Sequence, residues 1–278
     1  MKTKLFSYNQ LDTFIHKLSG LTKLICFILL TASVMFVFDI RVILGVMVIS
    51  YVLLIISKVK FRQIALFALY ALVFLITNFI LTYLFSPQYG VELYGTCHEL
   101  FRFSSRYIVT QEQLFYQITK LFKYFSVIPL GMLFIFTTDP SEFASSLNRI
   151  GVSYKACTSL ALTLRYFPDV ANDYNNIKLA QQARGLDMSK KSSLKERFKN
   201  TAAILLPLVF TTLDRVELIS NAMDLRGYGK YNKRTWYNSR KLQLRDYLAL
   251  LFCLVVLSVS LYIRIFVNKG FYYNPFVR

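Results

Sequence analysis

The stretch "IALFALYALVFLITNFILTYLF", residues 64–85, contains no charged side chain and decides the class of the fold. A helix needs roughly 20 apolar residues to cross about 30 Å of hydrocarbon, and this run is long enough. The composition agrees with it, because 55% of the 278 residues are hydrophobic and 16% are aromatic, more than an ordinary soluble domain contains. The sequence therefore predicts an integral membrane protein.

Four further apolar runs predict four more membrane helices, about five in all. Their approximate bounds are 24–38, 42–57, 124–138 and 247–263. The runs that begin at residues 24 and 124 are short, so we expect Lys23 and Lys123 to extend their ammonium groups to the lipid headgroups and lengthen these spans. A signal peptide is the alternative for the first run, but no small-residue cleavage site follows it, and a hairpin of two helices fits better.

Positive charge indicates which loops are cytoplasmic, because Lys and Arg are enriched there. Residues 139–245 contain 18 basic and nine acidic residues, whereas the loop at 86–119 contains two basic and three acidic ones. We therefore expect a multi-pass protein of the cell membrane, with a cytoplasmic N-terminus, residues 139–245 cytoplasmic and the C-terminus external. Topology and the anionic lipid bilayer then explain much of the net charge of +18, and nucleic-acid binding is not expected.

The predicted fold is all-α and polytopic, with a long cytoplasmic helical segment between the last two membrane helices. It divides into membrane helices one to four at 1–138, the cytoplasmic segment at 139–245, and the last helix with an external tail at 246–278. In the cytoplasmic segment we expect one helix to stop at Gly151, a second to begin near Pro168, and a third to follow.

Residues 201–213, "TAAILLPLVFTTL", are apolar but too few to cross the bilayer. They belong against the membrane face or a partner subunit, or in the core of the cytoplasmic part.

The cytoplasmic segment carries one pattern twice: Ala, three residues, Arg, Gly. The copies are "LAQQARGLDM" at residues 179–188 and "NAMDLRGYGK" at residues 221–230. Each glycine can take the left-handed conformation that ends a helix, and helix capping alone would explain a single copy. Two copies predict two matching contacts with a partner. Ala180 and Ala222, one turn before Arg184 and Arg226, would allow a close approach, while each guanidinium binds a carboxylate.

These motifs, with the preceding "LRYFPDVANDYNNIK" and "LLPLVFTTLDRVELIS", resemble the transmembrane T component of energy-coupling factor transporters, the EcfT/CbiQ family. The resemblance implies a non-catalytic subunit that links two cytoplasmic ABC ATPases to a small membrane S subunit, which binds a vitamin or another micronutrient. It also implies that Ala-Arg-Gly helix ends dock in the ATPases. The matching residues are Ala183, Arg184 and Gly185 in the first copy and Leu225, Arg226 and Gly227 in the second, where Leu225 departs from the family's alanine.

No nucleotide-hydrolysing motif is found in the sequence, since "RGYGK" lacks the earlier glycine of a P-loop. ATP and Mg²⁺ are therefore expected on the partner subunits, and no cofactor or metal on this chain. A membrane enzyme is disfavoured because His16 and His98 are assigned to opposite sides, and because Asp169 and Asp173 read as a solvated helix face. A stand-alone secondary transporter of a small solute is the main alternative, although its usual repeated halves are not apparent.

Overall fold

The structure, a computed structural model, describes residues 13–58, 61–102, 108–186, 194–231, 235–236, 240, 242–268, 270 and 272–276, without the side chains of 61–67, 102, 140 and 194–197. These residues are mainly helical, which confirms the all-α class, and a small antiparallel sheet of β1 (Glu99–Arg102) and β2 (Ile108–Thr110) is added to the helices. Contacts divide the chain into residues 1–139 with 240–278, here called the membrane unit, and residues 140–239, the hairpin unit. The predicted divisions at residues 138 and 245 concern sides of a bilayer and stay predictions.

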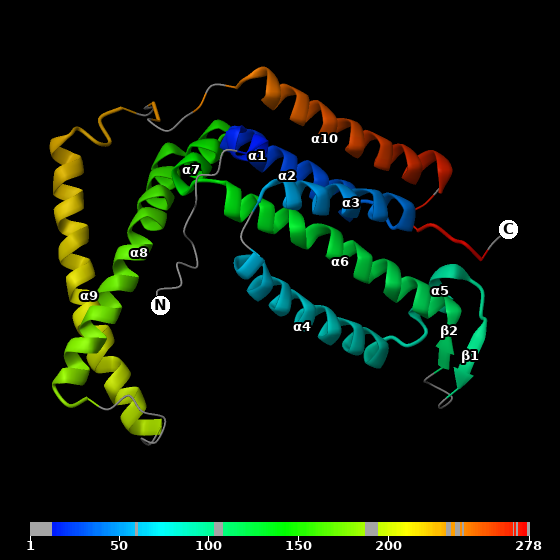
Figure 1. The fold of residues 1–278 in the computed structure, drawn as a ribbon, viewed down its shortest axis with the longest axis horizontal. Helices are drawn as coiled ribbons and strands as arrows, with labels where there is room; N and C mark the ends of the chain where they lie inside the picture. Colours follow the sequence, from blue (N-terminus) through cyan, green and yellow to red (C-terminus); the bar gives the residue numbers. More distant parts are fainter. Residues whose placement is uncertain are drawn as a thin grey trace. The chain divides into compact units, whose positions relative to one another are not determined.

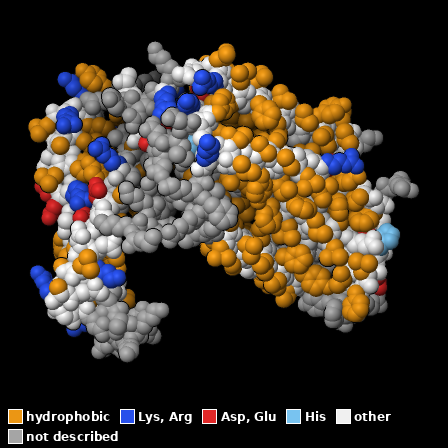
Figure 2. All heavy atoms as spheres, in the orientation of Figure 1, with side chains coloured by type: hydrophobic (Ala, Val, Ile, Leu, Met, Phe, Trp, Pro, Cys, Tyr) orange, Lys and Arg blue, Asp and Glu red, His pale blue; other side chains and the backbone are white. Residues whose placement is uncertain are grey.

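The membrane unit is built around one long central helix, α6 (Gln111–Thr137). Its other helices are α1 (Phe14–Lys17), α2 (Gly20–Met35), α3 (Ile40–Ile56), α4 (Phe61–Phe85), α5 (Tyr89–Tyr94) and α10 (Leu244–Tyr262), which continues into the π-helix η1 (Ile263–Val267). Helices α2, α3 and α4 pack against α6, and α10 packs on α2 (Figure 1). Figure 2 shows hydrophobic side chains over most of the visible surface of this unit. Such a surface suits contact with lipid.

Three helices of the described residues are long and apolar enough to cross a bilayer, at 68–85, 111–137 and 244–267, while α2 and α3 are shorter apolar helices. The prediction that the fourth span begins near residue 124 is wrong. Helix α6 begins at Gln111, where the hydroxyl of Thr110 accepts a hydrogen bond from the Gln113 amide at 3.3 Å. The apolar run stops at Lys123 in the sequence, but the helix does not, because its polar side chains find partners within the unit.

Lys23 and Lys123 are both buried, so the prediction that they reach the headgroups is wrong. The Lys23 ammonium, in a side chain that is 4% exposed, donates to the carbonyl of Thr137 at 2.7 Å, at the end of α6. The Lys123 ammonium donates to the carbonyl of Met35 at 3.1 Å, at the end of α2, and lies 3.8 Å from the centre of the Phe38 ring. The two antiparallel helices thus each place a cation at the negative end of the other.

Polar contacts also close the two ends of the membrane unit. At one end the Asp246 carboxylate accepts from the backbone amides of Ser19 at 2.9 Å and Gln243 at 2.8 Å, which joins the starts of α2 and α10. At the other end the C-terminal tail crosses the turn between α2 and α3. There the Tyr273 amide donates to the Phe38 carbonyl at 3.2 Å, and the Arg41 guanidinium donates to the Tyr273 hydroxyl at 2.6 Å. Both ends of the bundle are therefore fixed by backbone-directed bonds.

We expect Lys23→Met to lower the free energy of unfolding by about 1–3 kcal/mol, because the last carbonyl groups of α6 lose a charged donor while the side-chain volume is kept. Denaturant unfolding of the purified full chain in detergent measures this change. Lys155→Met, at an exposed position of the hairpin unit, is the control and should change stability by less than about 0.5 kcal/mol. Equal stability of the two variants would contradict the proposed role of the Lys23 bond.

Candidate functional site at two helix ends

The hairpin unit contains α7 (Pro140–Arg149), α8 (Tyr154–Ala183) and α9 (Leu194–Leu225). Helix α7 ends before Gly151, whose φ of 113° confirms the predicted stop. The prediction that the next helix begins near Pro168 is wrong, because the Ser153 hydroxyl caps α8 by accepting from the Ala156 amide at 3.4 Å. Pro168 lies inside α8, where it removes one amide donor but leaves the remaining hydrogen bonds of a 30-residue helix.

The first Arg-Gly motif is the C-terminal cap of α8. Arg184 is the capping residue, and Gly185 follows it with a φ of 89°. The Gly185 amide donates to the Gln182 carbonyl at 3.0 Å, and the Leu186 amide donates to the Gln181 carbonyl at 3.1 Å. This pair of bonds is a Schellman motif, which a left-handed glycine makes possible. The predicted helix end is confirmed.

The second motif ends α9 with the same geometry. Gly227 has a φ of 68°, and its amide donates to the Asp224 carbonyl at 2.8 Å. The Tyr228 amide donates to the Met223 carbonyl at 2.9 Å. The two bonds occupy the same positions relative to the arginine as those in α8. The repeated sequence therefore produces a repeated structure, down to the individual backbone bonds.

Most residues of both motifs are exposed. At the end of α8 the exposed residues are Ala180, Ala183, Arg184 and Gly185, and at the end of α9 they are Ala222, Leu225 and Arg226, with Gly227 partly buried. Leu225 is 90% exposed, which is unusual for a large aliphatic side chain. The helix ends thus present small residues, an arginine and, in one case, a leucine on the surface of the unit.

Helices α8 and α9 are antiparallel, so they carry the two motifs to opposite ends of the hairpin unit. Near the middle, the Arg215 guanidinium donates to the Asp173 carboxylate at 2.6 Å. Arg184 and Arg226 each lie 11 residues beyond this pair along their own helix. At 1.5 Å per residue the two arginines are therefore separated by roughly 30 Å. They form two sites rather than one.

The Asp173–Arg215 ion pair was not foreseen, and the prediction that Asp173 belongs to a solvated face is wrong. Both side chains are about 70% buried, with 28% of Asp173 and 30% of Arg215 exposed. A signal for it existed in the sequence, because Asp173 precedes Arg184 by the same 11 residues as Arg215 precedes Arg226. Equivalent positions of two related helices meet where the helices cross.

The apolar residues 201–213 lie within α9 and only partly in a core. Ile204 is fully buried, but five large side chains nearby are 45–63% exposed. These are Leu205, Leu206, Val209, Phe210 and Leu213, here called the α9 stripe. Their spacing of one, three and four residues places them along one side of the helix. Most of this segment therefore does not form the core of the hairpin unit.

Residues 12–237 match the family model CbiQ, described as a cobalt transport protein. The match includes both Arg-Gly helix ends and most of the membrane unit. The chain belongs to the CbiQ family.

Individual relatives agree with the family. The energy-coupling factor transporter transmembrane protein EcfT of Clostridium kluyveri is 26% identical over 270 residues, which cover 93% of this chain and 95% of that protein. The EcfT protein of Exiguobacterium sibiricum is 29% identical over 171 residues, 59% of this chain and 63% of that protein. A putative ABC transporter ATP-binding protein of Bifidobacterium longum is 32% identical over 128 residues, 43% of this chain and 16% of that protein. This CbiQ-family chain is thus a transmembrane component of an energy-coupling factor transporter.

We expect Gly185→Ala to loosen the end of α8, because a φ of 89° costs a residue with a Cβ atom roughly 1 kcal/mol. The new methyl group meets no atom within 4 Å, so the effect isolates the backbone. Hydrogen exchange of the Gly185 and Leu186 amides should accelerate by about fivefold. Gly131→Ala is the control, since Gly131 also has open space around it but lies within α6. Unchanged exchange at the α8 end would contradict the strain.

Proposed function

We propose that this chain is the energy-coupling subunit of an ECF-type ABC importer for a vitamin or another micronutrient. Two cytoplasmic ABC ATPase subunits bind at the two Arg-Gly helix ends, and a small membrane S subunit binds the substrate. The observation that carries the proposal is the double occurrence of one Schellman-capped arginine end, roughly 30 Å apart on antiparallel helices. Two equal contacts at that separation fit two copies of one kind of partner domain.

Each helix end offers the chemistry of a small docking plug. At the first end, Ala180 and Ala183 leave room for a groove of the ATPase to approach, and Arg184 binds a carboxylate there in a forked pair. Gly185 turns the chain away from the groove. At the second end Ala222, Arg226 and Gly227 act in the same way. Leu225 takes the place of Ala183, so the second groove needs space for a larger apolar side chain.

Two further observations support this arrangement. The ATP-binding protein of Bifidobacterium longum contains a segment similar to this chain, so the two kinds of polypeptide occur covalently joined in one protein. The basic residues of 139–245 favour a cytoplasmic location for the hairpin unit, where ATPases are found. The N-terminus is then cytoplasmic as well, about five helices cross the membrane, and the C-terminus is external.

In this proposal the partner subunits hold ATP and Mg²⁺ and carry out hydrolysis, while this chain transmits motion. When ATP draws the ATPases together, α8 and α9 are displaced through their docked ends. The α9 stripe contacts the S subunit or the membrane face, where an exposed apolar surface is stable. The S subunit, which selects the substrate, then releases it to the inside.

We expect Arg184→Glu combined with Arg226→Glu to prevent retention of the ATPases, whereas each single change only weakens it. A buried arginine pair that loses its partner destabilises a complex by roughly 3–5 kcal/mol. The measurement is a detergent pull-down of the tagged chain from its native membranes, with mass determination of the bound proteins. The unchanged chain should retain two ATP-binding subunits and one small hydrophobic protein.

Lys155→Glu combined with Arg165→Glu is the matched control, because it makes the same change of charge at exposed positions of α8 away from its end. This control should retain the ATPases. Normal retention by the Arg184 and Arg226 double variant would show that the arginines are helix caps only. A chain that is isolated alone and binds a solute would instead be a secondary transporter.

A further inference from the structure

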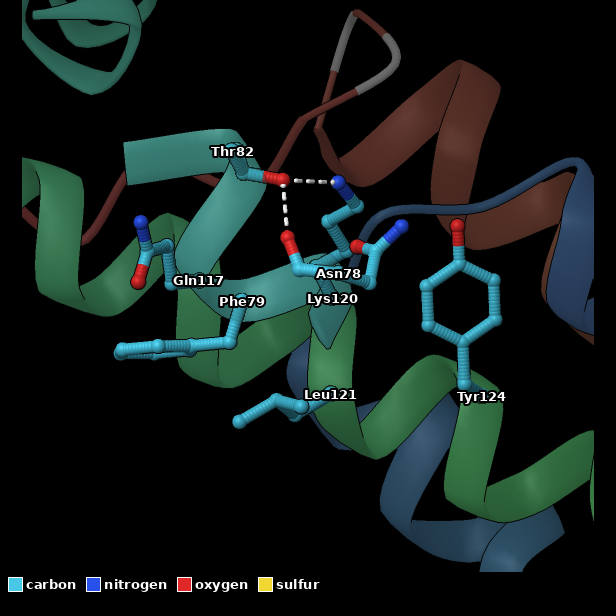
Figure 3. A pocket seen from close by; sticks show the side chains of 7 residues that line it. All are labelled: Asn78, Phe79, Thr82, Gln117, Lys120, Leu121 and Tyr124. Atoms are coloured by element: carbon cyan, nitrogen blue, oxygen red, sulfur yellow. Dashed lines mark hydrogen bonds between the residues drawn. The ribbon is translucent and has the colours of Figure 1, made fainter. Parts of the chain in front are cut away.

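A small polar hollow lies between α4 and α6, within the apolar surface of the membrane unit (Figure 3). Asn78 and Thr82 line it from α4, and Gln117, Lys120 and Tyr124 line it from successive turns of α6. Outside the hollow α4 is strongly apolar and exposed. Leu69, Tyr70, Phe74, Ile80, Leu81 and Phe85 are 47–78% exposed. The polar groups are therefore surrounded by surface that faces lipid.

Lys120 brings a positive charge into this hollow. Its ammonium donates to the Thr82 hydroxyl at 2.8 Å, and that hydroxyl donates to the Asn78 carbonyl at 2.7 Å. An ammonium has three N–H donors, and the bond to Thr82 uses one of them. Within the described ranges no carboxylate lies at ion-pair distance from Lys120. The hollow thus has a charge that this part of the chain leaves without a counter-ion.

Gln117 adds an unpaired amide on the same side of α6. Its side chain is 2% exposed, and neither its oxygen nor its nitrogen has a hydrogen-bond partner among the residues that the structure describes. Buried amides are nearly always hydrogen-bonded, because leaving both groups unpaired away from water is unfavourable. The amide lines the hollow in Figure 3, so a group that occupies the hollow is placed to satisfy it.

The depth of the hollow matches that of a phospholipid headgroup. Gln117 and Lys120 lie six and nine residues after the start of α6, about 9–14 Å along its axis. Thr82 lies three residues before the end of α4. The 27 residues of α6 span about 40 Å, longer than the hydrocarbon core of about 30 Å, so its ends extend among the headgroups. The hollow is therefore near the boundary between phosphate groups and acyl chains.

We propose that this hollow binds the phosphate group of an anionic phospholipid. The Lys120 ammonium pairs with the phosphate, and the Gln117 amide and the Tyr124 hydroxyl bond to phosphate or ester oxygens. Phe79 and Leu121, which also line the hollow, contact the acyl chains. A lipid fits better than a soluble anion because the hollow opens onto apolar surface. Since α4 packs chiefly on α6, the bound lipid also holds these two helices together.

The test is native mass spectrometry of the full chain, released from detergent after incubation with phosphatidylglycerol or with phosphatidylcholine. The unchanged protein should retain one phosphatidylglycerol with a preference of about five- to tenfold over phosphatidylcholine. Lys120→Met and Gln117→Leu should each reduce this retention. Lys120→Arg, which keeps the charge, should preserve it. Lys155→Met, which removes one charge from the hairpin unit, is the control and should behave like the unchanged protein.

Three results would overturn the proposal. One is equal phosphatidylglycerol retention by Lys120→Met and the unchanged chain. Another is equal thermal protection by inorganic phosphate and by phosphatidylglycerol, since the ligand would then be a soluble anion. The third is loss of a co-purifying membrane protein from Lys120→Met while lipid retention is unchanged, since the hollow would then be a contact between proteins.

Discussion

The reciprocal lysine contacts between α2 and α6 are the interaction on which the membrane unit depends. Carbonyl groups at a helix end cannot bond to water inside hydrocarbon, so another part of the protein has to supply donors. Lys23 supplies one to Thr137, and Lys123 supplies one to Met35. These two bonds fix both the direction and the offset of a 16-residue helix along a 27-residue one. Helix α3 then packs on α6, and α10 packs on α2.

The two units solve opposite problems with the same helical material. The membrane unit binds its polar groups internally and exposes apolar side chains, as lipid requires. The hairpin unit exposes arginine ends together with large apolar side chains such as Leu225 and the α9 stripe. In water such a surface is a mark of a protein that works in a complex. The hairpin unit therefore gains much of its stability from its partners, whereas the membrane unit is largely complete in itself.

Features that depend on neighbouring residues could be predicted from the sequence. The charge-free run at 64–85 was sufficient for the class of the fold, and an arginine followed by glycine was sufficient for the ends of α8 and α9. Features that depend on distant contacts could not. The start of α6 at Gln111 and the burial of Lys23 rest on bonds to segments more than 100 residues away in one case, and hydropathy contains no trace of them. The residues that hold the ATPases remain predictions, because they depend on molecules outside this chain.

The bond between the Ser19 amide and the Asp246 carboxylate connects positions 227 residues apart. A ribosome makes α2 early and α10 after the whole hairpin unit, so the start of α2 waits for its partner throughout that interval. Contacts of such long separation form late and slowly. The hairpin unit is therefore synthesised while the bundle that anchors it is still open. Completion of the bundle by α10 makes the last membrane helix a checkpoint for the assembly of the entire chain.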